Sequence, residues 1–281
     1  MPAFTLLSRN PFKAISWYPH RHFCASGWKK AIKKLAIVKK VAFVSRQGLS
    51  WLLTFCLSGA TLPFAVMNNT VKIETHSEYT RGELERDQLK PSPFDQFALW
   101  FEQAIAAKVV EPNAMSLATT GADQRPLVRT VLLKIFDQRG FVFFTNFESR
   151  KARQIGENAN VSLLFPWLAL ERQVIICGSA EKISTAESLS YFVTRPRGSQ
   201  LGAWVSAQSS VITTRSLLVQ KWEEMKRKFG EGEVPLPSFW GGFRVVPREI
   251  EFWQGRPSRL HDRVLYTRQP DDSWKIDRLA P

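Results

Sequence analysis

The densest group of chemically versatile side chains lies between residues 252 and 263, which read Phe-Trp-Gln-Gly-Arg-Pro-Ser-Arg-Leu-His-Asp-Arg. The three arginines of this stretch can bind phosphate or carboxylate oxygens through paired N–H groups. His261 changes charge near neutral pH, and Trp253 offers a flat apolar face to a ring-shaped ligand. A solvated basic hairpin turn has the same composition, so a binding role requires anion-binding groups elsewhere in the chain.

A second basic group, Ser149-Arg150-Lys151, precedes a helix that we expect to continue through Asn158. The N-terminus of a helix exposes free backbone N–H groups and a partial positive charge, to which this sequence adds two cations. The segment predicts a phosphate site. The alternative is a helix cap with two solvated charges.

Arg129 and Lys134 stand at the two ends of an apolar strand, Arg-Thr-Val-Leu-Leu-Lys. Charges within such a strand need partners if they are buried. Strict alternation places the two residues on opposite faces unless a bulge intervenes. We therefore expect them to contact different ligand groups, the alternative being a strand with two exposed ends.

Tyr191 and Arg195 are four residues apart in a predicted helix, so their side chains share one face, and Ser199 can add a hydroxyl. Together they predict a second phosphate cradle. Gln173 and the Gln208-Ser209-Ser210 turn supply amides and hydroxyls suited to the polar edge of a heterocycle. The four histidines show no paired spacing, and no metal site is predicted.

The elements that must position these groups are mainly strands. Ser92 and Pro93 begin a helix whose apolar face continues to Ile105. Two more helices are expected, at 184–195 with a capping box and at 213–229 before Gly230. The predicted strands are 115–119, 127–136, 141–145, 161–165, 172–183, 241–246, 249–253, 264–268 and 273–276. This pattern predicts a mainly β protein, a closed antiparallel barrel with peripheral helices.

The net charge of +14 is unevenly distributed. Ten of the 39 Lys and Arg lie in residues 1–66, which hold no Asp or Glu, so 29 basic residues face 25 acidic ones in the remainder. A nearly neutral body argues against nucleic-acid binding. The three cysteines, Cys24, Cys56 and Cys177, form neither a disulfide framework nor a metal motif, which favours a reducing compartment.

The chain divides into a basic and apolar extension at 1–66, a polar lead-in at 67–91 and a domain at 92–281. The apolar run from Trp51 to Val66 is short for a membrane helix, which argues against membrane association. The extension is open to several readings: an export segment, an organellar presequence, a disordered region, or an upstream-translation artefact with Met67 as the true start. We expect a cytoplasmic protein, or an organellar one if residues 1–66 are a presequence.

Taken together, these segments resemble the pyridoxine/pyridoxamine 5′-phosphate oxidase family. The similarity runs from Tyr79 to the last residue, in order and with family-like spacing. The motifs that carry it are Arg129–Lys134, Phe144–Asn146, Ser149–Lys151, Glu171–Val174, Thr194–Arg197, Gln200–Trp204, Gln208–Ser210, Pro235–Gly242, Glu251–Gly255, Arg259–Arg263 and Arg278–Pro281.

The resemblance implies a split β-barrel homodimer with FMN at the subunit interface. It also implies oxidation of pyridoxamine or pyridoxine 5′-phosphate to pyridoxal 5′-phosphate, with O2 as acceptor and H2O2 as product. The implied FMN contacts are Arg129, Thr130, Val131, Leu132, Leu133, Lys134, Phe144, Thr145, Arg150, Lys151, Gln173, Gln208, Ser209, Trp253 and Arg263. The implied substrate contacts are Lys134, Tyr191, Arg195, Ser199, Arg259, Leu260 and His261, with Arg259 and His261 as the catalytic candidates.

Two separate cradles for two phosphates follow from this assignment. The flavin phosphate is expected on Arg129, Arg150 and Lys151, and the substrate phosphate on Lys134, Tyr191, Arg195 and Ser199. Arg256 has no role in it and is expected to be a solvated turn residue.

Three positions depart from the family pattern. Phe144 stands where tyrosine is common, Thr194 where serine is common, and His76 where some members have arginine, near Tyr79 in an N-terminal lid. The competing functions are another split-barrel flavoprotein such as a flavin reductase, a non-catalytic binder of FMN or pyridoxal phosphate, and a basic nucleic-acid or membrane binder.

Overall fold

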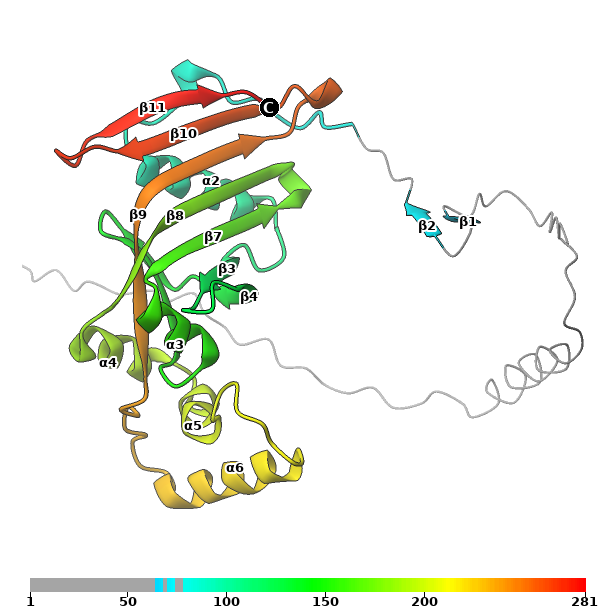
Figure 1. Cartoon of the computed structure of the whole chain (residues 1–281). Coiled ribbons are helices and arrows are strands. Elements are labelled where there is room, and N and C mark those ends of the chain that lie inside the picture. Colours follow the sequence, from blue (N-terminus) through cyan, green and yellow to red (C-terminus); the bar gives the residue numbers. More distant parts are fainter. Residues whose placement is uncertain (1–63, 68–69, 74–77) are drawn as a thin grey trace, which may run out of the picture. The chain divides into compact units, whose positions relative to one another are not determined.

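The computed structural model describes residues 64–67, 70–73 and 78–281 (Figure 1). Strands β1 (Phe64–Met67) and β2 (Thr70–Ile73) form a two-stranded sheet of their own. Most of the 1–66 extension, and His76, lie outside the described residues. All further description concerns residues 78–281.

A nine-stranded antiparallel sheet forms the body of the domain. Its strands are β3 (Ala114–Thr120), β4 (Pro126–Leu132), β5 (Ile135–Asp137), β6 (Gly140–Asn146), β7 (Asn160–Trp167), β8 (Arg172–Lys182), β9 (Trp240–Gln254), β10 (Asp262–Arg268) and β11 (Trp274–Leu279). The pairings run β4-β3-β7-β8-β9-β6-β5. The strands β4 and β5 stand at the two ends of this order and are not paired with each other, so the sheet forms a split barrel. The predicted mainly β barrel with peripheral helices is confirmed.

The long strand β9 belongs to two parts of the sheet. Its first half pairs with β6 from Trp240 to Val245, and its second half pairs with β10 from Glu249 to Gln254. Figure 1 shows it running from the helical end of the domain up to the β10–β11 hairpin. One strand therefore connects the barrel to an outer sheet.

Helices cover the ends and one side of the barrel. They are α2 (Pro93–Ala106), α3 (Arg150–Glu157), α4 (Thr185–Thr194), α5 (Arg197–Val205) and α6 (Ser216–Phe229), with 3-10 turns η2 (Arg86–Gln88), η3 (Leu168–Leu170) and η4 (Pro257–Arg259). Ser92 caps α2, Ser184 and Glu187 form the expected capping box of α4, and Gly230 ends α6.

Three expectations about these elements were wrong. The strand predicted at 127–136 is interrupted, because Leu133 turns into the core, where it is 4% exposed, while the Lys134 N–H bonds to Val142 O. The two strands predicted between 241 and 253 are the single strand β9, which accommodates Pro247 at a register shift opposite Cys177 and Gly178. Helix α5 was not predicted. Its two glycines lower helix propensity, and packing against Trp222 of α6 compensates.

Two apolar cores are present. The larger fills the barrel beneath α2, where the Phe97 ring lies 5.0 Å from the rings of Phe141 and Phe165. The smaller lies among α4, α5, α6 and the start of β9, around Phe192, Leu201 and Trp240. The smaller core forms one side of the pocket described below.

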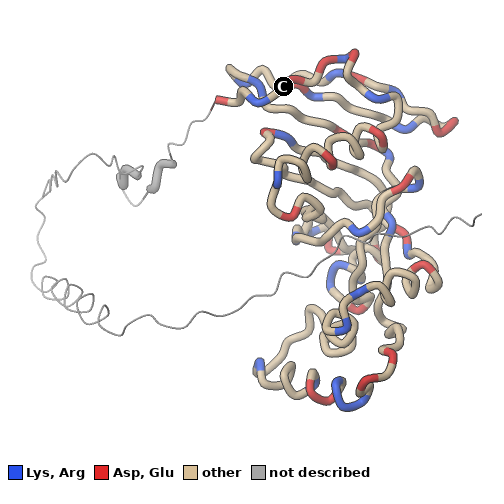
Figure 2. Tube along the Cα trace, turned by 180° about the vertical axis from the view of Figure 1, so that it is seen from behind, with Lys and Arg blue, Asp and Glu red and all other residues tan. Residues whose placement is uncertain are grey.

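Within the described ranges, Lys and Arg are interspersed with Asp and Glu along much of the trace (Figure 2), whereas residues 188–222 hold four Lys or Arg and no Asp or Glu. In that part of the chain no helix is long and apolar enough to cross a membrane. Residues 78–281 and the two short strands also bring together no group of three or more His, Cys, Asp or Glu that suits a metal ion.

Candidate active site

A pocket of about 510 Å³ opens between β4, β6 and the helices α3, α4 and α5. Its lining consists of Thr130, Val131, Leu132, Lys134, Phe144, Thr145, Lys151, Tyr191, Thr194, Arg195, Pro196, Ser199, Gln208 and Trp240. All of these except Thr194, Pro196 and Trp240 were candidate ligand contacts from the sequence. Segments from 130 to 240 therefore meet where the resemblance implied that they would.

Lys151 is at the centre of a polar cluster on one side of the pocket. Its Nζ donates to Gln208 Oε1 at 2.6 Å and to Thr145 Oγ1 at 3.1 Å, and Thr145 Oγ1 donates to Gln208 Oε1 at 2.9 Å. Burial, with a smaller contribution from the charge of Arg129, lowers the pKa of Lys151 to about 8. The ammonium is therefore held where an anion would stabilise it.

The N-terminus of α3 lies beside this cluster. Ser149 caps the helix by accepting from the Ala152 N–H, and the Arg150 N–H donates to Ser209 Oγ at 3.3 Å. Ser209 adopts a left-handed conformation with φ 71°, an uncommon backbone state for serine that often marks functional positions. Two of the free N–H groups expected here thus already have partners within the chain.

Arg129 is not among the residues that line the pocket. It donates to Leu117 O at 3.1 Å and to Thr119 Oγ1 at 2.6 Å, and burial, with the charge of Arg150, lowers its pKa. Of the three cations expected around the flavin phosphate, only Lys151 lines the pocket. Arg129 and Arg150 contribute positive potential close to it.

Arg195 lies on the opposite side, one residue beyond the end of α4. Its Nη1 is buried without a hydrogen-bond partner, and its guanidinium stands 4.6 Å from the centre of the Trp240 ring. Burial lowers its pKa, and the nearby Tyr191 raises it slightly in return. Buried polar groups without partners are rare in proteins, and this N–H is free to donate to an anion in the pocket.

Phe144, at the position where tyrosine is common in the family, takes part in an aromatic stack and has no hydroxyl to offer. Its ring lies 4.0 Å from the Tyr191 ring and 5.3 Å from the Trp240 ring, nearly parallel to both. Burial raises the pKa of Tyr191, which keeps its phenol protonated and able to donate. The stack aligns two side chains that belong to the predicted substrate cradle, Tyr191 and Arg195.

A second cluster of predicted residues lies on three neighbouring strands, β8, β9 and β10. Trp253 is in register with Gln173 on one side and with Arg263 on the other. The His261 ring is 4.7 Å from the Trp253 ring, and Tyr79 is edge-on to both, at 5.6 and 5.7 Å. Gly255 makes this possible, because a Cβ there would stand 2.7 Å from Tyr79 Cγ.

The loop from Arg256 to His261 has two features that bear on chemistry. Arg259 has φ 61° and Ser258 has φ 54°, so two consecutive non-glycine residues are left-handed. The Arg256 N–H donates to His261 Nδ1 at 3.1 Å, which places the proton of a neutral imidazole on Nε2. Leu260 is exposed.

Two arginines of this region, Arg263 and Arg256, have carboxylate partners. Arg263 pairs with Glu251 at 2.8 Å. Arg256, expected to be a solvated turn residue, is partly exposed, pairs with Glu83 at 2.7 Å and approaches Asp262 at 3.8 Å. The 78–89 segment folds back onto the hairpin and brings Glu83, which is distant in sequence, to this turn.

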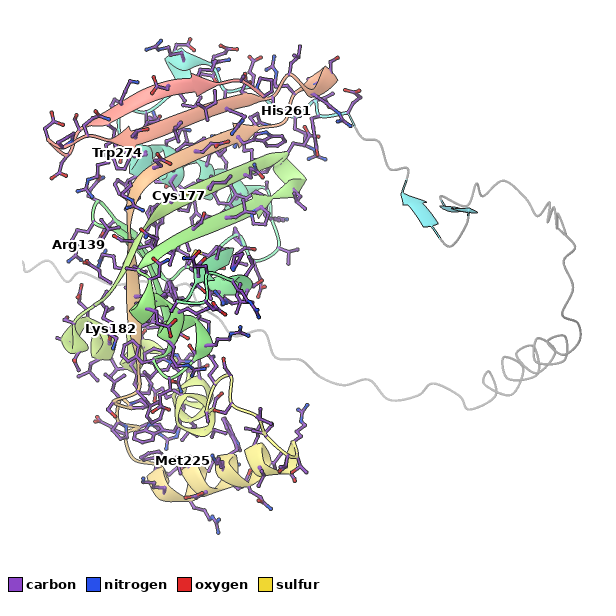
Figure 3. All side chains as sticks on the ribbon, viewed as in Figure 1. Arg139, Cys177, Lys182, Met225, His261 and Trp274 are labelled. Carbon is purple, nitrogen blue, oxygen red and sulfur yellow. The ribbon has the colours of Figure 1, made fainter. Side chains whose placement is uncertain are left out.

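The two clusters are separate within one chain. None of Gln173, Trp253, Arg259, Leu260, His261 and Arg263 lines the 510 Å³ pocket, and neither do Arg129, Leu133, Arg150 and Ser209. Figure 3 shows His261 at the β9–β10 end of the outer sheet, and Met225 of α6 at the opposite end of the domain, beyond the helices that border the pocket. A single copy of the chain thus holds the predicted ligand contacts in two separate groups.

The sequence of the chain matches known family models and known proteins. Residues 101–229 match the family model described as pyridoxamine 5′-phosphate oxidase, and residues 240–281 match the pyridoxine 5′-phosphate oxidase C-terminal dimerisation region. The chain is 65% identical over 204 residues to the pyridoxine/pyridoxamine 5′-phosphate oxidase of Rippkaea orientalis, covering 73% of this chain and 96% of that protein. It is 57% identical over 204 residues to the oxidase of Escherichia coli O1:K1, covering 73% and 93%.

Solved structures show the same fold. The crystal structure of PhzG from Burkholderia lata, in complex with tetrahydrophenazine-1-carboxylic acid, superposes with a TM-score of 0.66 at 31% identity, covering 69% of this chain and 95% of that one. An FMN-binding protein from Nostoc punctiforme, related to pyridoxamine 5′-phosphate oxidase, gives 0.57 at 16% identity over 69% of this chain and all of that one. With its barrel, its pocket and these relatives, the chain belongs to the pyridoxine/pyridoxamine 5′-phosphate oxidase family.

Proposed function

We propose that the chain catalyses the FMN-dependent oxidation of pyridoxamine 5′-phosphate and pyridoxine 5′-phosphate to pyridoxal 5′-phosphate. Relatives at 53–66% identity, matched over most of their own length, are named pyridoxine/pyridoxamine 5′-phosphate oxidase. The observation that carries the proposal is the buried, unpartnered Nη1 of Arg195 in a pocket that also exposes Lys134 and Ser199. These groups form a receptor for an anion.

The donor set of the pocket fits the phosphate of FMN on its other side. Lys151, Thr145 and Gln208 converge within hydrogen-bonding distance, and the depressed pKa of Lys151 indicates a cation that lacks a counter-charge. A phosphate dianion supplies that charge. Arg129 and Arg150 strengthen the positive potential without contacting the pocket.

We propose that a second copy of the chain completes the site. The Gln173, Trp253, Arg259, His261 and Arg263 cluster has no access to the pocket of its own chain, so it meets the pocket of the partner subunit, and FMN lies at the interface. The match of residues 240–281 to a dimerisation region supports this. Exposed apolar side chains on and after β4, namely Val128, Leu132 and Ile135, supply surface for the contact.

In this assembly each residue has a limited task. Lys134, Tyr191, Arg195 and Ser199 bind the substrate phosphate, and Arg259 and His261 of the partner subunit orient the substituent on the reacting carbon. With its Nδ1 occupied as an acceptor, a neutral His261 donates through Nε2 rather than accepting a proton there. The flavin supplies the two-electron acceptor, which O2 then reoxidises to give H2O2. For the amine substrate, water replaces nitrogen and ammonia leaves.

Protein purified from Met67 onward tests the proposal directly. We expect a yellow protein that consumes O2 and releases one equivalent of H2O2 for each pyridoxal 5′-phosphate formed. Apo-protein prepared by removing the flavin should regain activity with FMN and not with riboflavin, which lacks the phosphate. A colourless protein that cannot be reconstituted with FMN would refute the oxidase function, as would a flavoprotein that turns over without either phosphorylated substrate.

A further inference from the structure

Arg195 is partly buried, with its Nη1 enclosed, and it differs from the buried Arg244 in what holds it. The Arg244 side chain is 6% exposed and pairs with Asp137 at 2.6 Å and with Glu187 at 3.5 Å. Among the ion pairs of residues 78–281, none involves Arg195, and its Nη1 has no hydrogen-bond partner. A long, flexible side chain without polar anchors requires some other means of keeping its position.

The Trp240 ring supplies that means. The Arg195 guanidinium is 4.6 Å from the ring centre, within the range of a cation–π interaction. Trp240 is itself 7% exposed and is fixed as the first residue of β9, with its N–H bonded to Pro237 O at 3.1 Å. Phe144 stacks on it at 5.3 Å and Phe192 contacts it edge-on at 5.3 Å, so the ring cannot turn freely.

An aromatic face has a property that a carboxylate lacks. A carboxylate that anchored Arg195 would occupy two N–H groups and cancel the charge before any ligand arrived. The face of an indole attracts the cation through its quadrupole and uses none of the five N–H donors. The guanidinium is thus fixed in place while it keeps its charge and its hydrogen-bonding capacity.

We propose that Trp240 is a positioning residue for the substrate phosphate: it holds the Arg195 guanidinium in the orientation that phosphate oxygens require. This role rests on the proposed function, since Arg195 is assigned there to the substrate phosphate. Trp240 then sets the affinity for the phosphorylated substrate and affects neither the flavin site nor the reacting carbon. It was not among the residues predicted from the sequence to contact a ligand.

The test compares Trp240→Leu and Trp240→Phe with Trp204→Leu. Trp204 is a matched control, because it packs against the same small core and has a cation–π contact of its own with Lys228 at 5.5 Å, yet it does not line the pocket. In the FMN-loaded protein, Trp240→Leu should raise KM for pyridoxamine 5′-phosphate about tenfold, and Trp240→Phe about threefold, as the strength of cation–π contacts predicts. kcat and the Kd for FMN should change less than about twofold in both variants, since the loss is of one cation–π contact. Trp204→Leu should change neither KM nor the Kd for FMN.

A double-mutant cycle separates positioning from general packing. In an Arg195→Ala background, Trp240→Phe should have no further effect on the Kd for pyridoxal 5′-phosphate, measured by calorimetry on the FMN-loaded protein. If Trp240→Phe still raises the Kd for pyridoxal 5′-phosphate about threefold in the Arg195→Ala background, the proposal is overturned. Parallel losses of FMN and substrate affinity in Trp240→Phe would also overturn it.

This measurement needs no turnover. If the protein fails to oxidise either substrate but still binds pyridoxal 5′-phosphate with the coupling described, the proposed activity fails and the role of Trp240 stands. If the protein oxidises its substrate but Trp240 and Arg195 act independently, only the role of Trp240 fails.

Discussion

The cations of the pocket and those of the outer sheet are held in opposite ways. In the pocket, Lys151 is bound by a hydroxyl and an amide and Arg195 by an aromatic face, and neither has a carboxylate partner among the described residues. In the outer sheet, Arg263 pairs with Glu251, and Arg278 pairs with Asp262 at 3.0 Å. Both regions are rich in cations, but Lys151 and Arg195 keep their charge available whereas Arg263 and Arg278 are neutralised by carboxylates.

This difference distinguishes cations that bind a ligand from cations that stabilise the fold. A buried cation without a counter-ion lowers stability, and a chain retains it where a ligand supplies the missing charge. A paired cation is already satisfied and instead holds the segments that contribute its partners. On this reasoning the pocket binds the two phosphates, and the paired arginines of the outer sheet fix the loop that presents Arg259 and His261.

Arg195→Ala should give the largest effect on substrate binding. Loss of charge-assisted hydrogen bonds to phosphate predicts a rise in KM for pyridoxamine 5′-phosphate of about 100-fold. The Kd for FMN should change less than about threefold, because the flavin phosphate is assigned to the other side of the pocket. Arg248→Ala serves as the control, since Arg248 is exposed on β9 and contacts Asn160. Equal losses for both ligands would contradict the assignment of two cradles.

The pH dependence of FMN binding should report on Lys151. Its pKa of about 8 lies below the ordinary 10.5, so the amine loses its proton as pH rises through about 8. A phosphate dianion favours the ammonium, and FMN affinity should fall about tenfold between pH 7.5 and 9.5. Lys151→Met should bind FMN more weakly at pH 7.5 and show little of this decline.

The stability of the apo-protein should change in the opposite direction. A lysine with a lowered pKa destabilises the fold below about pH 8 and is relieved as pH rises towards 10.5, so this group makes the apo-protein more stable at pH 9 than at pH 7. Fluorescence titration of FMN and thermal melts over the same pH series measure both effects. An FMN affinity that does not depend on Lys151 above pH 8 would show that another group binds the flavin phosphate.

Asp262→Ala should lower stability and barely alter the pocket. Asp262 accepts from the Leu84 N–H at 3.1 Å and pairs with Arg278, so its loss leaves a buried N–H unsatisfied. We expect the variant to lose about 2 kcal/mol of stability. Its Kd for FMN should stay unchanged. Glu83→Ala should cost no more than about 0.5 kcal/mol, since Glu83 pairs with Arg256 at the exposed surface. Denaturant unfolding with both variants side by side measures the difference.

Local sequence signals predicted the elements that depend on short-range chemistry. The cap at Ser92 and the capping box at Ser184 appear as expected, because each depends on residues within a few positions. Most pocket residues were also identified, since a resemblance in motif spacing reports on residues that meet in space.

Features that depend on distant contacts could not be predicted in the same way. Helix α5 relies on packing against Trp222, and Glu83, the nearer carboxylate partner of Arg256, comes from the 78–89 segment. The role of Trp240 depends on Arg195, which is 45 positions away in the sequence yet contacts it directly. Nothing in the local sequence around Trp240 indicates a charge above its ring.

In the proposed homodimer, each active site combines the pocket of one copy with the outer sheet of the other. Mixed dimers of Arg195→Ala and Arg259→Ala, isolated with two different affinity tags, test it most directly. Each variant alone has two defective sites, whereas a mixed dimer has one intact site and one doubly defective site. Its kcat/KM should recover to about half that of a doubly tagged unmodified dimer. A mixed dimer no more active than the mean of its two parent variants would show that each chain builds its site alone.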